Sequence, residues 1–218
     1  MGQKKSTSLG TEKAKTYRIE TDRLILRCYR LEDASMVSEA IGKSLDHLRP
    51  WMPWARHHPE NPASTVNLLT AFRDKFYADE DYFFGIFNKT ETELIGSTGL
   101  HTRIGHSARE IGYWINVAHV RQGYATEAVS ALIKIGFAVE NLKRLEIRCD
   151  PNNSISQKIP KALGFSNTTT LIGNTGEDGK LRDTMIWSLL LTDYKDRSLP
   201  AVSVKAFGKD GNEISLRQ

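Results

Sequence analysis

Apolar and polar residues alternate along residues 21–30, which places Leu24, Leu26 and Cys28 on one side of the chain. A repeat of two residues is typical of a β-strand that buries one face. Further strand-like runs follow, and polar turn residues separate the first three of them, which indicates an antiparallel meander. These runs are residues 82–88, 93–102, 109–116, 143–149, 166–172 and 182–191.

A repeat of three and four residues predicts helices in other parts of the chain. One helix opens at residues 31–33, a second spans about 63–78, and a short one ends at Leu163–Gly164, where glycine fits the left-handed position after a helix. Residues 123–139 are apolar on most sides, which predicts a buried helix that lies across a sheet. Four prolines within residues 48–62 predict a loop between the first two helices.

Together these elements predict one α+β domain over residues 16–194, with a mixed, mostly antiparallel sheet of about seven strands flanked by helices. Residues 1–15 are polar and lack periodicity, so we expect a disordered tail. Two apolar runs in the extension 195–218, at 201–207 and 213–216, are joined by a glycine-containing turn. The extension is therefore a hairpin or a loosely ordered tail, and its role stays open.

The composition changes this picture little. Hydrophobic residues make up 39% and charged residues 26%, as in soluble globular proteins. No secretory signal and no apolar run of roughly 20 residues is apparent, so we expect a cytoplasmic protein without a membrane span. The first fifteen residues carry +3 of the net charge of +4, and this location disfavours nucleic acid as a partner. Met1–Ser6 fits the N-myristoylation pattern, but we interpret this segment as a solvated leader.

The strongest chemical signal lies in residues 120–128, between a predicted strand and the most hydrophobic predicted helix. The first turn of a helix offers unpaired backbone N–H groups and the positive end of the helix dipole. Gly123 permits close approach and a positive φ, Ala125 keeps the next turn narrow, and Arg121 adds a positive charge. An extended anion such as a pyrophosphate can bind there. The spacing matches neither a Walker loop nor the GxGxxG fingerprint.

This segment resembles motif A of the GNAT N-acetyltransferase superfamily, Arg/Gln-x-x-Gly-x-Gly/Ala. Gly123 and Ala125 match its last two fixed positions, whereas Val120 stands where Arg or Gln is usual. Further blocks resemble the ribosomal-protein N-acetyltransferase (RimJ/RimL-like) branch of that superfamily, and the resemblance covers about residues 17–193. These blocks are residues 94–101, 110–115, 126–128, 150–156 and 162–165.

The resemblance implies a GNAT fold and an acetyl-CoA-dependent N-acetyltransferase, with acetyl-CoA as cosubstrate and no metal. In the family, motif A holds the pyrophosphate of coenzyme A. Backbone amides of the preceding strand bind the pantetheine arm and stabilise the thioester carbonyl. The residues that this implies for cosubstrate binding are Ile115, Asn116, Val117, Arg121, Gln122, Gly123, Tyr124, Ala125, Thr126, Asn153 and Ser156.

The same resemblance makes Ser156 the candidate acid that protonates the leaving sulfur, while capping of a helix is the alternative role for Asn153 and Ser156. For the general base we consider Glu110, Glu127 and His101. Glu110 is equally consistent with a solvated strand position, and for Glu127 we prefer a role in the first helical turn. An α-amino group has a pKa near 7.7–8.0, so a weak or water-mediated base suffices.

Trp51 and Trp54, together with His101, are expected to face the acceptor, although the tryptophans could instead only fasten the proline-rich loop. The leading acceptor is the N-terminal amine of a protein such as a ribosomal protein, ahead of a polyamine or an antibiotic. A non-catalytic acyl-CoA-binding regulatory protein on the same fold is the alternative from another class. The family also leads us to expect a homodimer. Pro160 within a predicted helix indicates a late start or a kink.

Overall fold

The structure of the protein is a computed structural model that describes residues 15–56, 62–175, 180–195 and 202–216. Most of the predicted tail and the myristoylation pattern lie outside these residues. The helices are α1 (Ala34–Leu48), α2 (Pro62–Tyr77), α3 (Tyr124–Ala138), α4 (Ser154–Ala162) and α5 (Leu191–Lys195). The strands are β1 (Arg18–Glu20), β2 (Leu24–Arg27), β3 (Tyr82–Asn88), β4 (Leu94–His101), β5 (Ala108–Ile115), β6 (Arg144–Cys149), β7 (Ser166–Thr175), β8 (Leu181–Leu190), β9 (Lys205–Phe207) and β10 (Glu213–Ile214).

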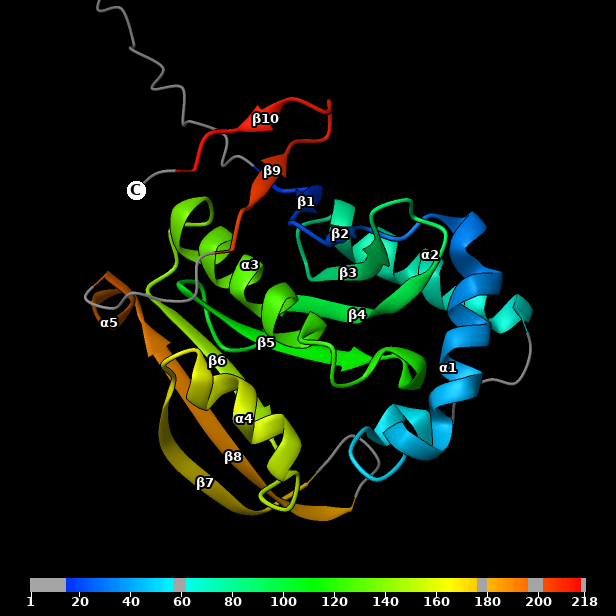
Figure 1. The fold of residues 1–218 in the computed structure, drawn as a ribbon. Coiled ribbons are helices and arrows are strands. Elements are labelled where there is room, and N and C mark those ends of the chain that lie inside the picture. Colours follow the sequence, from blue (N-terminus) through cyan, green and yellow to red (C-terminus); the bar gives the residue numbers. More distant parts are fainter. Residues whose placement is uncertain (1–14, 57–61, 176–179, 196–201, 217–218) are drawn as a thin grey trace, which may run out of the picture.

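All described strands belong to one sheet in the order β10-β9-β1-β2-β3-β4-β5-β6-β8-β7. Neighbouring strands run antiparallel except for β5 and β6, which run parallel. The predicted α+β class with a mixed, mostly antiparallel sheet is therefore confirmed (Figure 1). The parallel pair occupies the seventh and eighth positions in this order, inside the sheet rather than at its edge, and it becomes the centre of the site described below.

The described strands number ten rather than about seven, because the sequence pattern did not indicate β1 and indicated β9 and β10 only as one alternative for the extension. Only residues 24–27 of the predicted strand 21–30 are extended into a ladder, and the Thr21 amide donates to the Leu24 carbonyl in a tight turn. β1 has three residues, of which only Ile19 is fully buried. A strand this short carries too little periodicity to be detected.

β9 and β10 form an antiparallel hairpin, and β9 pairs with β1 so that Arg18 lies opposite Phe207. Ala206 is fully buried against the α3 side of the sheet. Of the two alternatives for the extension, the described part takes the hairpin. The hairpin lies at the edge of the sheet beside β1, the first described strand (Figure 1).

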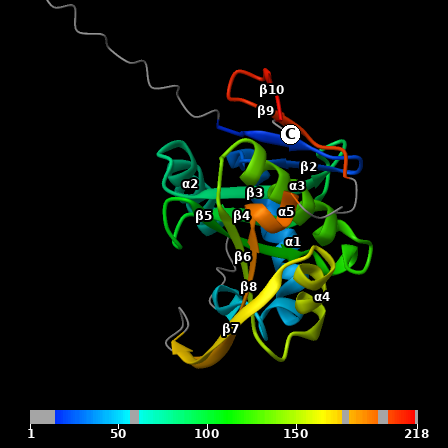
Figure 2. The same cartoon turned by 90° about the vertical axis from the view of Figure 1, so that its left-hand side faces the viewer.

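Helices cover both faces of the sheet, and α2 and α3 lie on opposite sides of it (Figure 2). Leu24, Leu26 and Cys28 contribute to the cluster under α3, whereas Ile25 contributes to the cluster under α1. This division confirms the predicted period of two. α3 is buried nearly along its length, as its apolar composition predicted. Cys28 and Cys149 are both free and buried.

The proline-rich segment is more ordered than predicted. Pro53–Arg56 forms a 3₁₀ turn, and α2 begins at Pro62. Proline is favoured at the first position of a helix, because the N–H that it lacks would have no intrahelical partner there. The described part of this segment therefore contains a short 3₁₀ turn and is not a loop throughout.

Candidate active site

β5 and β6 are paired at their beginnings and then separate from each other. They pair over Ala108–Glu110, opposite Arg144–Glu146, and the described strands pair no further. β5 nevertheless stays paired with β4 as far as Ile115, which lies opposite Gly96. The half of β5 that follows Glu110 therefore borders an opening, and Figure 1 shows the two strands diverging toward α4.

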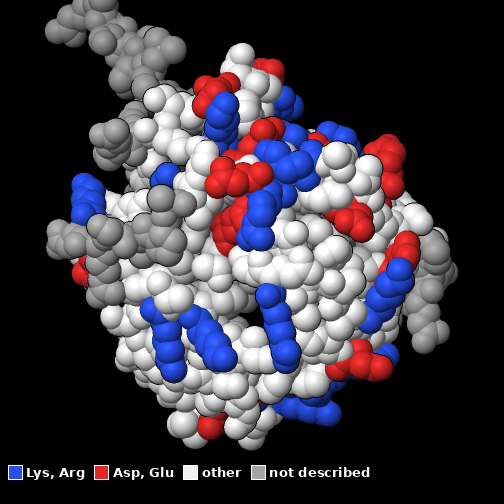
Figure 3. Space-filling view, in the orientation of Figure 1, with Lys and Arg blue, Asp and Glu red and all other residues white. Residues whose placement is uncertain are grey.

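Backbone amides of β5 point into this opening. The Asn116 amide donates to the Ile95 carbonyl of β4 at 2.9 Å. Successive amides of a strand point in opposite directions, so those of Ile115 and Tyr113 point away from β4, toward the gap. In Figure 3 the surface is hollowed between α3 and α4, and Lys and Arg side chains border the hollow.

The three amides that the sequence assigned to the cosubstrate are thus not equivalent. The Asn116 amide serves β4, and the Val117 amide donates to Ser44 Oγ on α1 at 3.0 Å. The Asn116 side chain holds the following turn, because its Oδ1 accepts the Ala118 amide at 3.1 Å. Of the three, only the Ile115 amide faces the opening, and Tyr113 supplies a second amide that the sequence did not indicate.

The predicted phosphate loop lies at the start of α3. Gly123 precedes the helix with φ +81°, and Arg121 also has a positive φ of +62°. The Glu127 amide donates to the Gly123 carbonyl, which closes the first helical turn. The amides of Tyr124, Ala125 and Thr126 belong to that first turn, where helix geometry gives an N–H no intrahelical acceptor. Such amides, together with the helix dipole, are suited to bind an anion.

Glu127 and Arg23 brace this loop. The Glu127 carboxylate accepts hydrogen bonds from Thr21 Oγ1 at 2.6 Å, the Arg23 amide at 3.0 Å and Arg23 Nε at 2.6 Å. Arg23 also donates to the Gln122 carbonyl at 2.9 Å, and its guanidinium lies over the Tyr124 ring at 4.5 Å. Glu127 therefore has the first-turn role that the sequence favoured. Arg23 was missed, since it lies about a hundred residues from the loop in sequence.

The segment that follows β6 places the predicted acid. Asn153 caps α4, with its Oδ1 accepting the Ser156 amide at 3.0 Å. The Ser156 hydroxyl does not cap the helix. It meets the hydroxyl of Tyr113 on β5, with an Oγ to Oη distance of 3.1 Å. The capping alternative thus holds for Asn153, and the side chain of Ser156 extends across the opening to β5.

Glu110 lies in a different environment from either one predicted. It is 5% exposed, so the solvated alternative is wrong. Arg103 binds both of its oxygens, at 2.9 and 2.5 Å, and Arg148 Nε lies 3.4 Å away. Glu110 also sits where β5 and β6 are still paired. Both carboxylate oxygens are thus occupied by arginine, so this geometry gives no support to Glu110 as the base.

His101 is held by Asp81. Its Nδ1 lies 3.0 and 3.1 Å from the two Asp81 oxygens, and only 8% of the residue is exposed. A Cβ added to Gly112 would approach His101 Nε2 to 3.0 Å, so this nitrogen lies against the glycine of β5. Burial opposes ionisation of Asp81, yet the hydrogen bond and charge of His101 outweigh it and lower the pKa of that carboxyl. In the neutral form of the ring, an Nδ1–H that donates to a carboxylate leaves Nε2 as the proton acceptor.

The two tryptophans lie on the α1 side of the sheet. Trp54 packs against Trp114 of β5, with ring centroids 6.1 Å apart. Trp51 follows the end of α1, and its backbone amide donates to the carbonyl of Leu48, the last residue of that helix, at 2.9 Å. Both residues are half-buried. Trp54 thus brings the proline-rich segment to the part of β5 that borders the opening.

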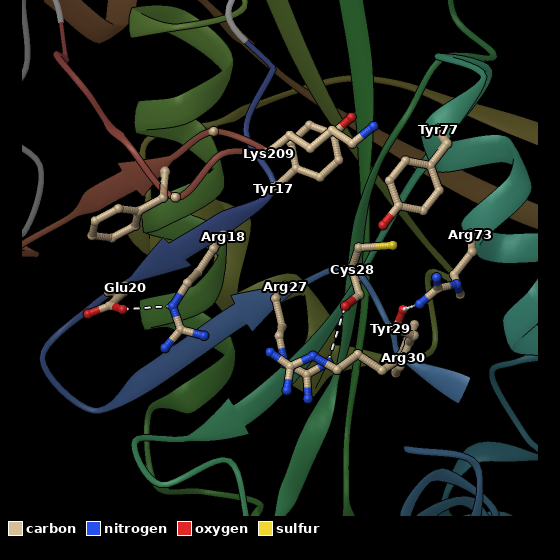
Figure 4. A pocket seen from close by; sticks show the side chains of 13 residues that line it. Tyr17, Arg18, Glu20, Arg27, Cys28, Tyr29, Arg30, Arg73, Tyr77 and Lys209 are labelled. Atoms are coloured by element: carbon tan, nitrogen blue, oxygen red, sulfur yellow. Dashed lines mark hydrogen bonds and ion pairs between the residues drawn. The ribbon is translucent and has the colours of Figure 1, made fainter. Parts of the chain in front are cut away.

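A separate pocket of about 410 Å³ lies between β1, β2, α2 and the hairpin (Figure 4). It is lined by several arginines, but Arg18 and Arg27 are already paired with Glu20, Glu91 and Asp33. None of the predicted site residues lines it. We therefore place the candidate active site at the β5–β6 opening, where unpaired amides and the phosphate loop converge.

Among the described residues, no cluster of three or more His, Cys, Asp or Glu side chains is arranged to hold a metal ion. No described helix combines the length and the apolar composition that crossing a membrane requires.

The chain is similar to known acetyltransferases in sequence and in fold. The family model described as "Acetyltransferase (GNAT) domain" matches residues 23–166. The uncharacterised N-acetyltransferase YoaA of Bacillus subtilis is 28% identical over 79% of this chain and 96% of its own length. The [ribosomal protein uS5]-alanine N-acetyltransferase of Escherichia coli is 25% identical over 81% of this chain and 92% of its own length. The fold is similar to that of the microcin C7 self-immunity acetyltransferase MccE, solved with acetyl-CoA and AMP. The TM-score is 0.72 at 22% identity, over 78% of this chain and 93% of that one.

Proposed function

Since the chain belongs to the GNAT acetyltransferase family, we propose that it acetylates the N-terminal α-amino group of a protein of the ribosomal class. The chain is an acetyl-CoA-dependent N-acetyltransferase that acts on an amine. The proposal concerns the acceptor and the roles of individual residues. The observation that carries it is the opening between β5 and β6, with a phosphate loop at one end and Ser156 on its wall.

The residues of the opening fit acetyl-CoA. The amides of Tyr124, Ala125 and Thr126 would bind the pyrophosphate, and Arg121 adds positive charge at the exposed mouth of the loop. The amides of Tyr113 and Ile115 would bind the pantetheine arm and the thioester carbonyl, in place of the Asn116 and Val117 amides expected from the sequence. Acetyl-CoA supplies an activated acetyl group when bound. The protein then has to hold the carbonyl and move protons.

Ser156 is the proposed proton donor to the leaving sulfur. Its helix is anchored by the Asn153 cap, and its hydroxyl is held by Tyr113 at the edge of the opening. A hydroxyl that donates to a departing thiolate lowers the cost of breaking the carbon–sulfur bond.

His101 replaces Glu110 as the proposed base. Glu110 is neutralised by Arg103 and Arg148, and Glu127 is saturated by three donors. The Asp81 carboxylate fixes the His101 ring, and this is how a neutral imidazole is oriented as a proton acceptor. Because an α-amine is partly neutral at pH 7–8, His101 needs only to accept a proton through water.

A protein N-terminus is the proposed acceptor because the E. coli relative that is named for alanine acetylation on ribosomal protein uS5 matches over 92% of its own length. Trp51 and Trp54 would line the acceptor side of β5, next to Trp114. The homodimer and the cytoplasmic location expected from the sequence stay predictions.

The test is thiol release from acetyl-CoA with a panel of amines at one concentration. The panel contains peptides with free N-termini that begin with alanine or serine, the same peptides with blocked N-termini, spermidine and an aminoglycoside. Faster release with the free than with the blocked peptides supports the proposal. Release only with spermidine or the aminoglycoside rejects the protein acceptor. Acetyl-CoA binding without release would favour the regulatory alternative.

A further inference from the structure

Pro160 leaves one backbone carbonyl of α4 without its helical donor. The residue lies inside the helix Ser154–Ala162 and is buried. In a regular α-helix, the N–H at position 160 would donate to the carbonyl of Ser156. Proline has no N–H, and its ring crowds the carbonyl four residues earlier. The Ser156 carbonyl therefore lacks the donor that position 160 would supply in a regular helix and is available to another donor.

Tyr113 supplies that donor from the neighbouring strand. Its hydroxyl donates to the Ser156 carbonyl at 3.2 Å and lies 3.1 Å from Ser156 Oγ. The contact joins residues 43 positions apart and spans the opening between β5 and α4. Tyr113 thus binds the backbone and the side chain of the same serine.

The phenol is suited to remain protonated. Burial raises the pKa of Tyr113, and this outweighs the smaller opposite effect of the Ser156 hydrogen bond. A neutral phenol keeps its proton for the carbonyl. Its oxygen then accepts the hydrogen bond of the Ser156 hydroxyl, which holds this hydroxyl until its proton passes to the leaving sulfur.

We propose that Tyr113 is a positioning residue that fixes the Ser156 hydroxyl at the leaving sulfur, and that Pro160 makes this possible by releasing the Ser156 carbonyl to Tyr113. The proposal rests on the proposed function, which assigns Ser156 as the acid. It adds two residues that the resemblance did not assign, since Tyr113 was noted only as part of a matching strand and Pro160 only as an irregularity of the helix.

The protons of the reaction balance without a change in Tyr113. The amine nitrogen forms a bond to the acetyl carbon, the carbon–sulfur bond breaks, and its electron pair goes to sulfur. Ser156 gives its hydroxyl proton to that sulfur and regains a proton from solvent, while the proton lost by the amine passes through water to His101, which later releases it to solvent. Tyr113 holds the serine throughout and keeps its own proton.

The first test is a double-mutant cycle of Tyr113→Phe and Ser156→Ala, read as kcat and as the Kd of acetyl-CoA. Loss of one hydrogen bond corresponds to about a tenfold fall in kcat for Tyr113→Phe, with the Kd unchanged. In the Ser156→Ala background, Tyr113→Phe should have no further effect, because the phenol acts through the serine. Tyr29→Phe is the matched control, since it removes a buried hydroxyl from the other hydrophobic cluster.

Pro160→Ala gives a result that a merely structural role would not produce. Alanine restores an N–H that can donate to the Ser156 carbonyl and so compete with Tyr113. We expect the melting temperature to rise or stay level, because alanine is the better helix former, while kcat falls several-fold. A rise in both stability and kcat would contradict the role of Pro160.

A second measurement tests the contact between Tyr113 and Ser156 without turnover. It is the pKa of the thiol of bound CoA, determined from the absorbance of the thiolate. A hydroxyl aimed at sulfur stabilises the thiolate, so Tyr113→Phe and Ser156→Ala should both raise this thiol pKa. If the wild type binds CoA but acetylates nothing, the proposed function fails, and this measurement still decides on Tyr113. Effects of Tyr113→Phe and Ser156→Ala that multiply independently, or a thiol pKa that neither changes, would overturn the proposal. A wild type that binds no CoA would overturn both.

Discussion

At the scale of single residues, the chemistry of the site depends on contacts between distant parts of the chain. Asn153 and Ser156 could be predicted because they belong to one local motif, whose spacing is visible in the sequence. Tyr113 and Arg23 could not, because their partners lie 43 and 104 residues away. The surroundings of Glu110 could not be predicted for the same reason, because Arg103 and Arg148 approach its carboxylate only after the strands assemble.

Asp81→Asn should reveal the hydrogen bond to His101 as pH-dependent stability. The folded-state pKa of Asp81 lies below the usual unfolded value near 3.9. Its stabilisation is therefore present above about pH 4 and is lost as the pH falls through the lowered folded value. We expect the substitution to cost about 1–2 kcal/mol of unfolding free energy at pH 7, with the difference closing in acid.

Urea unfolding between pH 2.5 and 7 measures this effect. Asp74→Asn, at an exposed position of α2, is the control and should stay within about 0.5 kcal/mol of the wild type. A stability difference for Asp81→Asn that is constant over the whole pH range would rule out the ionised carboxylate as its source.

At the scale of elements, the sequence located the phosphate loop because its requirements are local. A glycine at the turn and an apolar helix after it are both read within ten residues. Gly123 indeed has φ +81°, where a side chain is strained. The sequence located α4 as well but could not assign a use to Pro160, because the carbonyl that proline frees is bound by another element.

Gly123→Ala should therefore weaken cosubstrate binding together with stability. A non-glycine residue at positive φ costs roughly 1–2 kcal/mol, and relaxation of the turn would redirect the amides of the first α3 turn. We expect the Kd of CoA to rise about tenfold or more, as measured by calorimetry.

Gly42→Ala is the matched control for that substitution. Gly42 lies within α1, and a Cβ there meets nothing within 4 Å. Alanine should stabilise the helix by roughly 0.5–1 kcal/mol and leave the Kd unchanged. Equal CoA affinities for the two variants would show that the turn at Gly123 does not form the anion site.

At the scale of the whole molecule, the α+β class followed from the order of strands and helices, whereas the full extent of the sheet did not. The hairpin adds two strands to the sheet beside β1, so β1 lies between the hairpin and β2. No local pattern indicates that residues near 206 pair with residues near 19. The separation of β5 from β6 is also a property of the assembled sheet, and no local pattern in the sequence indicates it.

Truncation after residue 201 should separate stability from cosubstrate binding. It removes the buried Ala206 and the half-buried Ile214 and Leu216, and it exposes β1 as an edge. We expect a loss of about 2–3 kcal/mol, or about 5–10 °C in melting temperature, with an unchanged Kd for CoA at 15 °C. A chain that lacks only residues 217–218 is the control. A large loss of CoA affinity would mean that the hairpin supports the active site.

The most direct test of the central claim is the position of the acetyl group on a product. Wild-type protein is incubated with acetyl-CoA and a lysine-containing peptide that has a free N-terminus, and the product is mapped by tandem mass spectrometry. The account predicts one added acetyl group, on the α-amino nitrogen, and a several-fold or greater slowing with Ser156→Ala. Acetylation of the lysine side chain alone, or no acetylated product although acetyl-CoA binds, would contradict it.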